Sequence, residues 1–188
     1  RMAMRKLKEQ GYQRPAMVGA IKDEQNTRNT HAAGFVYGQF KHFADENHIP
    51  FYEFDRKPTE VLDEEVYQWI RDVKPDALLS YWNNFANSAY RLTVEDGHHC
   101  RFVPIDADDQ PIEYGGIRSN HGNIAQTAIE KLIGKIEMNE RGFRDCITTT
   151  LVHETWREFG PWPPKYSYTE SFQRSDSPTP PTEPSQAV

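Results

Sequence analysis

The sequence predicts an α/β domain, a parallel sheet flanked by helices. Short apolar segments alternate along the chain with longer segments in which apolar residues recur at helical spacing, the patterns of buried strands and amphipathic helices. Strands that alternate with helices form right-handed βαβ units, and such units in succession build a doubly wound parallel sheet. A chain of 188 residues is long enough for one such domain with a sizeable core.

The expected elements follow one another with no internal repeat. The first helix, residues 2–10, ends at Gly11, since glycine is common just after the last turn of a helix. Strands are expected over residues 15–20, 50–54, 77–80, 101–105 and 115–119, with a β-prone segment over 148–156. Further helices are expected over residues 35–43, 66–73, 85–97 and 124–136, whereas residues 21–29 are polar and predict a loop.

The last part of the chain differs in composition from the rest. Residues 161–188 are rich in Pro, Ser and Thr and poor in apolar residues. Such a segment cannot bury enough surface to offset the entropy of ordering it. We therefore expect one domain over residues 1–160 and a disordered tail over residues 161–188.

Charge and cysteine content argue against several classes of protein. The net charge of -6 argues against a nucleic-acid surface on this chain, because phosphate binding depends on clustered Lys and Arg. Cys100 and Cys146 are too few for a disulfide framework, which suits a reducing compartment. No apolar run approaches the about 20 residues of a membrane-spanning helix, and no signal peptide opens the sequence. These observations predict a cytoplasmic protein with no membrane partner, and the helical pattern already under way at Arg1 suggests a piece of a longer chain.

The stretch of residues 77–87 predicts a ligand site. Its apolar run ends abruptly in Trp82, Asn83 and Asn84 before a helical pattern begins. Ligands of open α/β sheets bind outside the carboxyl ends of the strands. These three residues are therefore expected at the lip of a binding site.

Five stretches, in order, resemble the effector-binding domain of lactose-repressor-type (LacI/GalR) transcriptional regulators. Residues 6–19 resemble that family's run of helix, glycine, basic turn and apolar strand, and His-Ala-Ala-Gly-Phe at residues 31–35 resembles its Arg-x-x-Gly-Phe. Residues 75–86 are similar to its segment of Pro-Asp-Ala, strand, Asn-Asp and Met-Ala. Residues 102–106 are similar to the strand that ends in the family's effector-contacting Asp, and residues 116–119 with the following helix resemble its return crossover.

The resemblance implies one lobe of a two-lobed, periplasmic-binding-protein-like fold. The helix-turn-helix and most of the first lobe have no counterpart here, so the match is to the second lobe plus the return crossover at about residues 115–137. In the family, a sugar or another small metabolite binds between the lobes and changes the geometry of paired DNA-binding heads. The resemblance thus implies the ligand-binding portion of a transcriptional regulator that senses a small-molecule effector, a sugar above all. It also implies homodimers in full-length relatives, and DNA contact only through a module that is not in this sequence.

The same resemblance implies five ligand-binding residues, Arg28, His31, Trp82, Asn83 and Asp106. Trp82 would offer an aromatic face to a sugar ring, and Asn83 and Asp106 would bind its hydroxyl groups, while Arg28 and His31 approach from above the first strand. Four residues depart from the family pattern: Trp82 stands where Asn is usual, Asn83 where Asp is usual, His31 where Arg is usual, and Pro104 where Gly is usual. These changes at the predicted binding site imply an effector that differs from those of the family. The simpler alternatives are that Trp82 is a core aromatic residue and that Asn83 caps the next helix.

Two clusters have the residue types of a metal or acid–base site. Asp106, Asp108 and Asp109 follow a strand, where carboxylates more commonly serve solubility. The second cluster comprises His98, His99 and Cys100 with His121 or Cys146. Its spacing lacks the Cys-x-x-Cys or His-x-x-x-His of a zinc site, and the sequence contains no phosphate-binding loop or nucleophile elbow. We therefore expect no enzymatic activity, no metal and no cofactor.

Two other functions remain open, and one helix requires a partner. A solute-binding protein of a transport system shares the fold but is exported, and a truncated remnant would have no activity of its own. Without a first lobe, the apolar stripe of the helix at residues 124–136 has no obvious cover. We expect this helix either to dock on the remaining sheet or to drive self-association.

Overall fold

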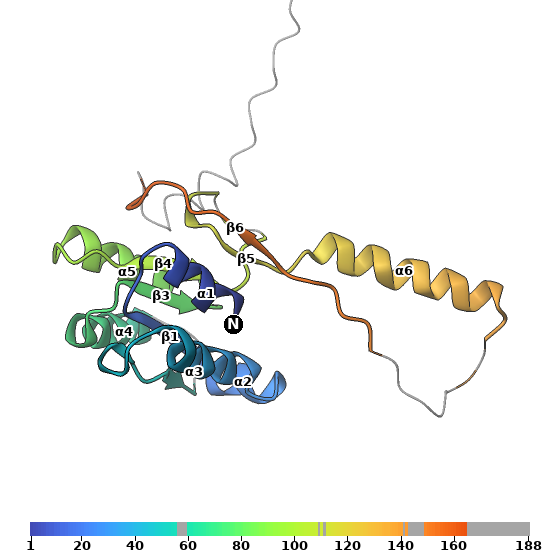
Figure 1. Ribbon diagram of the computed structural model, residues 1–188, viewed down its shortest axis with the longest axis horizontal. Helices are drawn as coiled ribbons and strands as arrows, with labels where there is room; N and C mark the ends of the chain where they lie inside the picture. Colours follow the sequence, from blue (N-terminus) through green and yellow to red (C-terminus); the bar gives the residue numbers. More distant parts are fainter. Residues whose placement is uncertain (56–59, 109, 111, 141, 143–148, 165–188) are drawn as a thin grey trace, which may run out of the picture.

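The computed structural model describes residues 1–55, 60–108, 110, 112–140, 142 and 149–164. Its central feature is a four-stranded parallel sheet in the order β2-β1-β3-β4 (Figure 1). The strands are β1 (Pro15–Ala20), β2 (Tyr52–Phe54), β3 (Ala77–Ser80) and β4 (Arg101–Pro104). The predicted parallel α/β fold is confirmed, and the carboxyl ends of the strands lie along one edge of the sheet.

Helices cover both faces of this sheet. One face carries α4 (Glu60–Val73) and α5 (Phe85–Val94), which pack against each other, and the opposite face carries α1 (Met2–Glu9) and α3 (Thr30–His42). A shorter helix, α2 (Ile21–Asn26), follows β1 directly, and 3-10 turns occupy Asp45–Asn47 and Ile112–Tyr114. The sheet is thus the middle layer of three.

Each face of the sheet has its own buried core. On one face α4 buries Val66 and Ile70 fully, a spacing that places both side chains on one stripe of the helix. On the other face α1 packs on α3 through Met4, which is 1% exposed. A Cβ atom at Gly38 of α3 would collide with Cγ of Met4, so only glycine allows these two helices to approach so closely.

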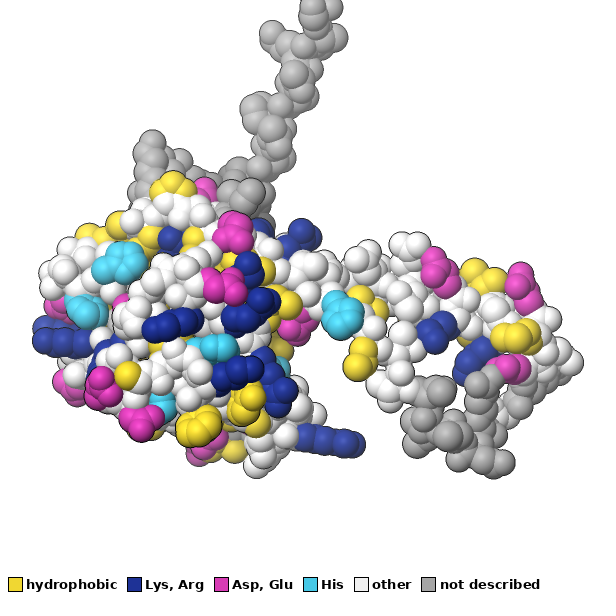
Figure 2. Space-filling view, in the orientation of Figure 1, with side chains coloured by type: hydrophobic (Ala, Val, Ile, Leu, Met, Phe, Trp, Pro, Cys, Tyr) yellow, Lys and Arg dark blue, Asp and Glu magenta, His cyan; other side chains and the backbone are white. Residues whose placement is uncertain are grey.

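An arm projects from this lobe. Strands β5 (Gly116–Arg118) and β6 (Thr155–Arg157) form a two-stranded antiparallel ribbon, and the arm, residues 119–154, connects them. Its helix α6 (His121–Glu137) extends away from the sheet in Figure 1, and none of its residues is buried. Figure 2 shows hydrophobic and charged side chains side by side at the surface of this arm. The prediction that this helix docks on the remaining sheet is therefore wrong.

Three expected boundaries differ from the structure. Residues 21–29, expected as a loop, contain the six-residue helix α2, which is too short and too polar to show an apolar repeat. Helices α3 and α6 begin earlier than expected, because their first turns have no large apolar side chains and add nothing to the apolar period. In the β-prone segment only Thr155–Arg157 forms a strand, and residue 148 lies outside the described residues.

The end of the domain is later than the composition indicated. Trp162 packs against the core, its Nε1 donating to Thr93 Oγ1 at 3.2 Å and its ring lying 5.9 Å from that of Tyr114. The segment before the predicted tail is held by Arg101, whose guanidinium lies over the rings of Phe159 and Trp162. Residues 165–188, the rest of the predicted tail, lie outside the described residues. None of the described helices combines the length and apolar character needed to span a bilayer.

Candidate functional site

A pocket of about 380 Å3 lies at the carboxyl edge of the sheet. It is lined by Asp23, Asn26, Thr27, His31, Tyr81 and Trp82. The first three belong to α2 and the turn after it, which follow β1, and Tyr81 and Trp82 follow β3. Because β1 and β3 are neighbouring parallel strands, their following segments meet at one place.

Trp82 forms one wall of this pocket and is held there by a carboxylate. Its indole Nε1 donates a hydrogen bond to Asp23 Oδ2 at 3.0 Å, and its backbone N–H donates to Ser80 Oγ at 3.0 Å. The ring also packs against the core beside Phe54, at 6.5 Å between centroids. Trp82 is therefore partly a core aromatic residue and partly a pocket residue, so both interpretations made from the sequence apply.

A buried carboxylate positions the opposite wall. Glu24 is 2% exposed and accepts from the backbone N–H of Ala32 and from His31 Nδ1, each at 3.0 Å. Since a carboxylate only accepts, Nδ1 of His31 carries a proton. Nδ1 also lies 3.3 Å from Thr27 Oγ1, and Nε2 of the same ring lies 3.0 Å from the hydroxyl oxygen of Tyr81. The His31 and Tyr81 rings also make an edge-to-face contact, with centroids 4.6 Å apart.

Carboxylates surround Tyr81. Burial raises the pKa of Tyr81 above its ordinary value of 10.0, and the charges of Glu154, Asp106, Glu24 and Asp23 raise it further. The phenol thus keeps its proton and remains available for hydrogen bonding. A pocket with two aromatic side chains and several hydrogen-bonding groups suits a small polar ligand that has one apolar face.

The structure brings together only part of the predicted site. His31 and Trp82 line the pocket, whereas Arg28 is exposed in the turn between α2 and α3 and does not line it. Asn83 follows Trp82, but its Oδ1 is buried with no hydrogen-bond partner in the part of the chain that the structure describes. It makes no side-chain cap to α5. Asp106 lies at the end of the next strand, β4, and faces the beginning of α6.

Four lining residues and the residue that orients His31 were not predicted from the sequence. Tyr81 directly follows β3, so the rule used for Trp82 also applies to it. Asp23, Asn26 and Thr27 fall in the segment taken for a loop, in and after a short helix, and no local pattern indicates them. Glu24 carried no signal, because its role depends on its burial between α2 and α3, and a single buried carboxylate has no sequence pattern.

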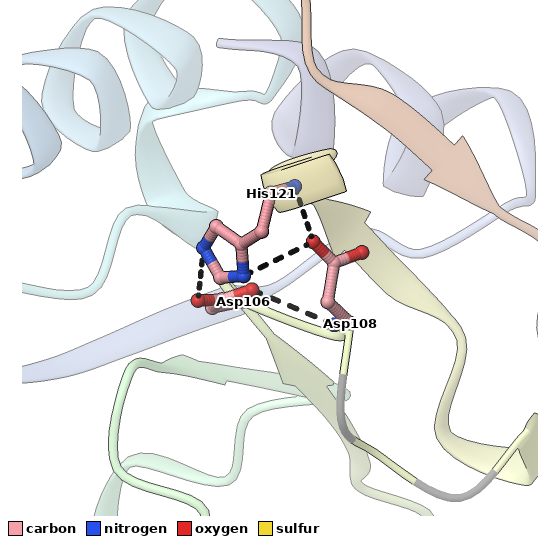
Figure 3. Close-up of side chains that lie close together, drawn as sticks. All are labelled: Asp106, Asp108 and His121. Carbon is pink, nitrogen blue, oxygen red and sulfur yellow. Dashed lines mark hydrogen bonds and ion pairs between the residues drawn. The ribbon is translucent and has the colours of Figure 1, made fainter. Parts of the chain in front are cut away.

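Asp106, Asp108 and His121 form a polar cluster where the arm leaves the lobe (Figure 3). Nε2 and Nδ1 of His121 lie 3.5 Å from Oδ2 of Asp106 and of Asp108. Arg118 Nε and the backbone N–H of His121 donate to Asp108 at 3.0 and 3.2 Å. Burial opposes ionisation of Asp108, but these two donors outweigh it and lower its pKa below the ordinary 3.8.

This cluster has the donor atoms that a divalent cation uses, and its ligand atoms lie within 4.8 Å of one another. However, the guanidinium of Arg118 already neutralises Asp108 at 3.0 Å, and a second cation there would be repelled by the first. The cluster is better described as an electrostatic connection between the lobe and α6. Asp109, the third carboxylate of the predicted cluster, lies outside the described residues.

The histidines and cysteine after Gly97 do not form a metal site with the other described residues. Within the described part of the chain, the Asp106, Asp108 and His121 group is the single set of three possible metal ligands. His98 Nε2 instead donates to the carbonyl oxygen of Pro75 at 3.0 Å. Cys100 is fully buried, and burial raises the pKa of its thiol, so it is an unreactive core residue.

The parallel α/β fold of this lobe is similar to part of several solved LacI-family regulators. A dimeric lac repressor with an 11-residue C-terminal deletion is 15% identical, with a TM-score of 0.59 over 84% of this chain and 60% of that one. The transcription regulator CcpA of Lactococcus lactis is 13% identical, with a TM-score of 0.54 over 84% and 60%. A LacI-family regulator from Lactobacillus casei with bound sucrose is 16% identical, with a TM-score of 0.52 over 85% and 60%.

The chain thus spans about 60% of the length of these structures, as predicted for a partial effector-binding domain. At such identities the likeness is one of fold. No family model matches the sequence, and no curated protein matches it.

Proposed function

We propose that this chain is the ligand-binding portion of a LacI-type transcriptional regulator and senses a sugar or a similar small polyhydroxylated metabolite. The observation that carries this proposal is the pocket at the ends of β1 and β3, where Trp82 presents an indole beside amide, hydroxyl and carboxylate groups. Sugars are bound by this combination of an aromatic face and planar hydrogen-bonding groups. Neighbours with this fold include regulators with bound ribose and bound sucrose.

The proposed role is regulatory, not catalytic. An effector in this pocket would contact α2, α3 and the segment after β3, and would favour one arrangement of this lobe relative to a facing lobe. Asp106 and Asn83, which follow β4 and β3, would add polar groups beside the pocket at the same edge of the sheet. We assign DNA contact to none of the described residues, and we place the protein in the cytoplasm, where the free thiol of Cys100 is stable.

Ligand titration tests this proposal. Calorimetry and tryptophan fluorescence with ribose, sucrose and glucose should show saturable binding by the 188-residue chain for at least one sugar. Trp82→Ala and Asn26→Ala, which each remove a lining side chain, should weaken that binding about tenfold or more, the cost of about 1.4 kcal/mol expected for a lost stacking or hydrogen-bonding partner.

The matched control is Trp69→Phe, because Trp69 packs on Tyr52 and does not line the pocket. It should leave affinity unchanged. Binding that survives both Trp82→Ala and Asn26→Ala would place the ligand elsewhere, and the absence of saturable binding for every sugar would overturn the proposed function.

A further inference from the structure

The pocket carries negative charge and no fixed positive charge. Its six lining residues include Asp23 but no Lys or Arg. Lys22 and Arg28, the cations of the same segment, are exposed and do not line it. A second carboxylate, Glu24, lies directly behind His31. An anionic ligand would therefore meet no fixed positive charge here.

The polar atoms of the pocket are mainly hydrogen-bond acceptors. Asp23 Oδ2 accepts from Trp82, and Asp23 Oδ1 has no hydrogen-bond partner among the residues that the structure describes. Thr27 Oγ1 donates its proton to the carbonyl oxygen of Asp23 at 2.9 Å and lies 3.3 Å from His31 Nδ1, which leaves it one lone pair for a ligand. The side-chain amide of Asn26 is a further hydrogen-bond donor in the pocket.

The buried Glu24 is linked to Tyr81 through His31. Glu24 accepts from Nδ1 of His31, and the hydroxyl of Tyr81 is hydrogen-bonded to Nε2 of the same ring at 3.0 Å. This hydrogen bond already uses part of the hydrogen-bonding capacity of Tyr81. The carboxylates that raise the pKa of Tyr81, after burial itself, place the hydroxyl in a negative potential.

Two aromatic rings complete this environment. Tyr81 and Trp82 both line the pocket, and the faces of such rings attract cations, tryptophan most strongly. A positively charged ligand group would therefore interact favourably with the rings, with Asp23 and with the unpaired acceptors at once. A neutral ligand of the same shape would use only the hydrogen bonds.

We propose that the pocket selects a cationic effector, a small polyhydroxylated amine of the amino-sugar class, over a neutral sugar or a sugar acid. This inference rests on the proposed function, because it specifies the ligand of the same pocket. An amine that carries a proton at neutral pH supplies the donors that the pocket lacks.

Matched pairs of sugars test the proposal by calorimetry at pH 7. The pairs are glucosamine with glucose, galactosamine with galactose, and mannosamine with mannose, and glucuronate serves as the anionic probe. For at least one pair the amine should bind at least tenfold more tightly than the neutral sugar, and glucuronate should bind most weakly. The preference should shrink as salt is raised from 50 to 500 mM, since added ions screen the charges.

Asp23→Asn separates charge from shape in the same pocket. An asparagine oxygen still accepts from Trp82 Nε1, so the indole stays in place, and the preference for the amine should fall below about threefold. The control Asp45→Asn changes an exposed carboxylate outside the pocket and should leave the preference intact. Equal binding of amine and neutral sugar, or a preference unaffected by Asp23→Asn, would overturn this inference and leave the proposed function standing. Failure of every probe to bind would overturn both.

Discussion

Helices α4 and α6 have the same amphipathic pattern and opposite surroundings. In α4 the apolar residues Val66 and Ile70 are 0% exposed, whereas in α6 Ile129 and Leu132 are each 58% exposed. The difference arises because α4 lies on the sheet and packs against α5, while α6 extends from the lobe on two chain segments (Figure 1). Apolar residues at helical spacing therefore predict a helix and its apolar face, but not which part of the protein, if any, covers that face.

The largest expected effect contrasts the two helices directly. Ile70→Ala should lower the free energy of unfolding by about 2–5 kcal/mol, because it opens a cavity in a filled core. Ile133→Ala in α6 should change it by less than about 0.5 kcal/mol, since that side chain is already 49% exposed. Urea unfolding at low micromolar concentration checks both values. An equal loss in the two variants would mean that α6 is covered in solution.

Self-association through the arm is the next effect. Exposed apolar surface on one face tends to find a partner. Ile136 of α6 and Met138, which directly follows the helix, are also more than half exposed. Size-exclusion chromatography with light scattering should show association that increases with concentration and that Leu132→Asp abolishes. Val94→Asp, at a side chain 50% exposed on α5, is the matched control and should leave the association unchanged. A monomer at all concentrations up to about 1 mM would contradict this prediction.

The smallest effect concerns the connection between lobe and arm. The pKa of Asp108 in the folded chain is below its ordinary 3.8, despite burial, because the backbone N–H of His121 and Arg118 stabilise its anion. The stabilisation is therefore complete above the ordinary pKa and is lost as pH falls through the lower, folded value. Because Arg118 is half exposed, it should amount to about 1 kcal/mol or less.

The measurement is urea unfolding between pH 6 and pH 2.5. The native chain should lose stability more steeply below pH 4 than Asp108→Asn, which cannot ionise at this position. Identical slopes in the two proteins would show that Asp108 does not contribute to the stability of the folded lobe.

The sheet was predictable from the sequence because each strand is a short apolar run followed by a helical repeat. The pocket was predictable only where a residue directly follows a strand or begins a helix with a recognisable pattern, as Trp82 and His31 do. Asp23 lies in a helix of six residues, too short to have a period, and Glu24 acts through burial between two helices. Asp106 and Asn83 also follow strands, as expected. However, the ends of neighbouring strands face different parts of the chain, and a local sequence pattern does not indicate which part each one faces.

The arm, residues 119–154, begins and ends at neighbouring points of the lobe, because Arg118 pairs with Thr155. These two residues are opposite each other in the antiparallel ribbon of β5 and β6, so the chain enters and leaves the arm at one place. A two-residue Asn-Gly turn is the natural connection between such positions. The lobe could therefore be closed as a β-hairpin with residues 119–154 removed, and its pocket retained on a smaller domain without the exposed helix.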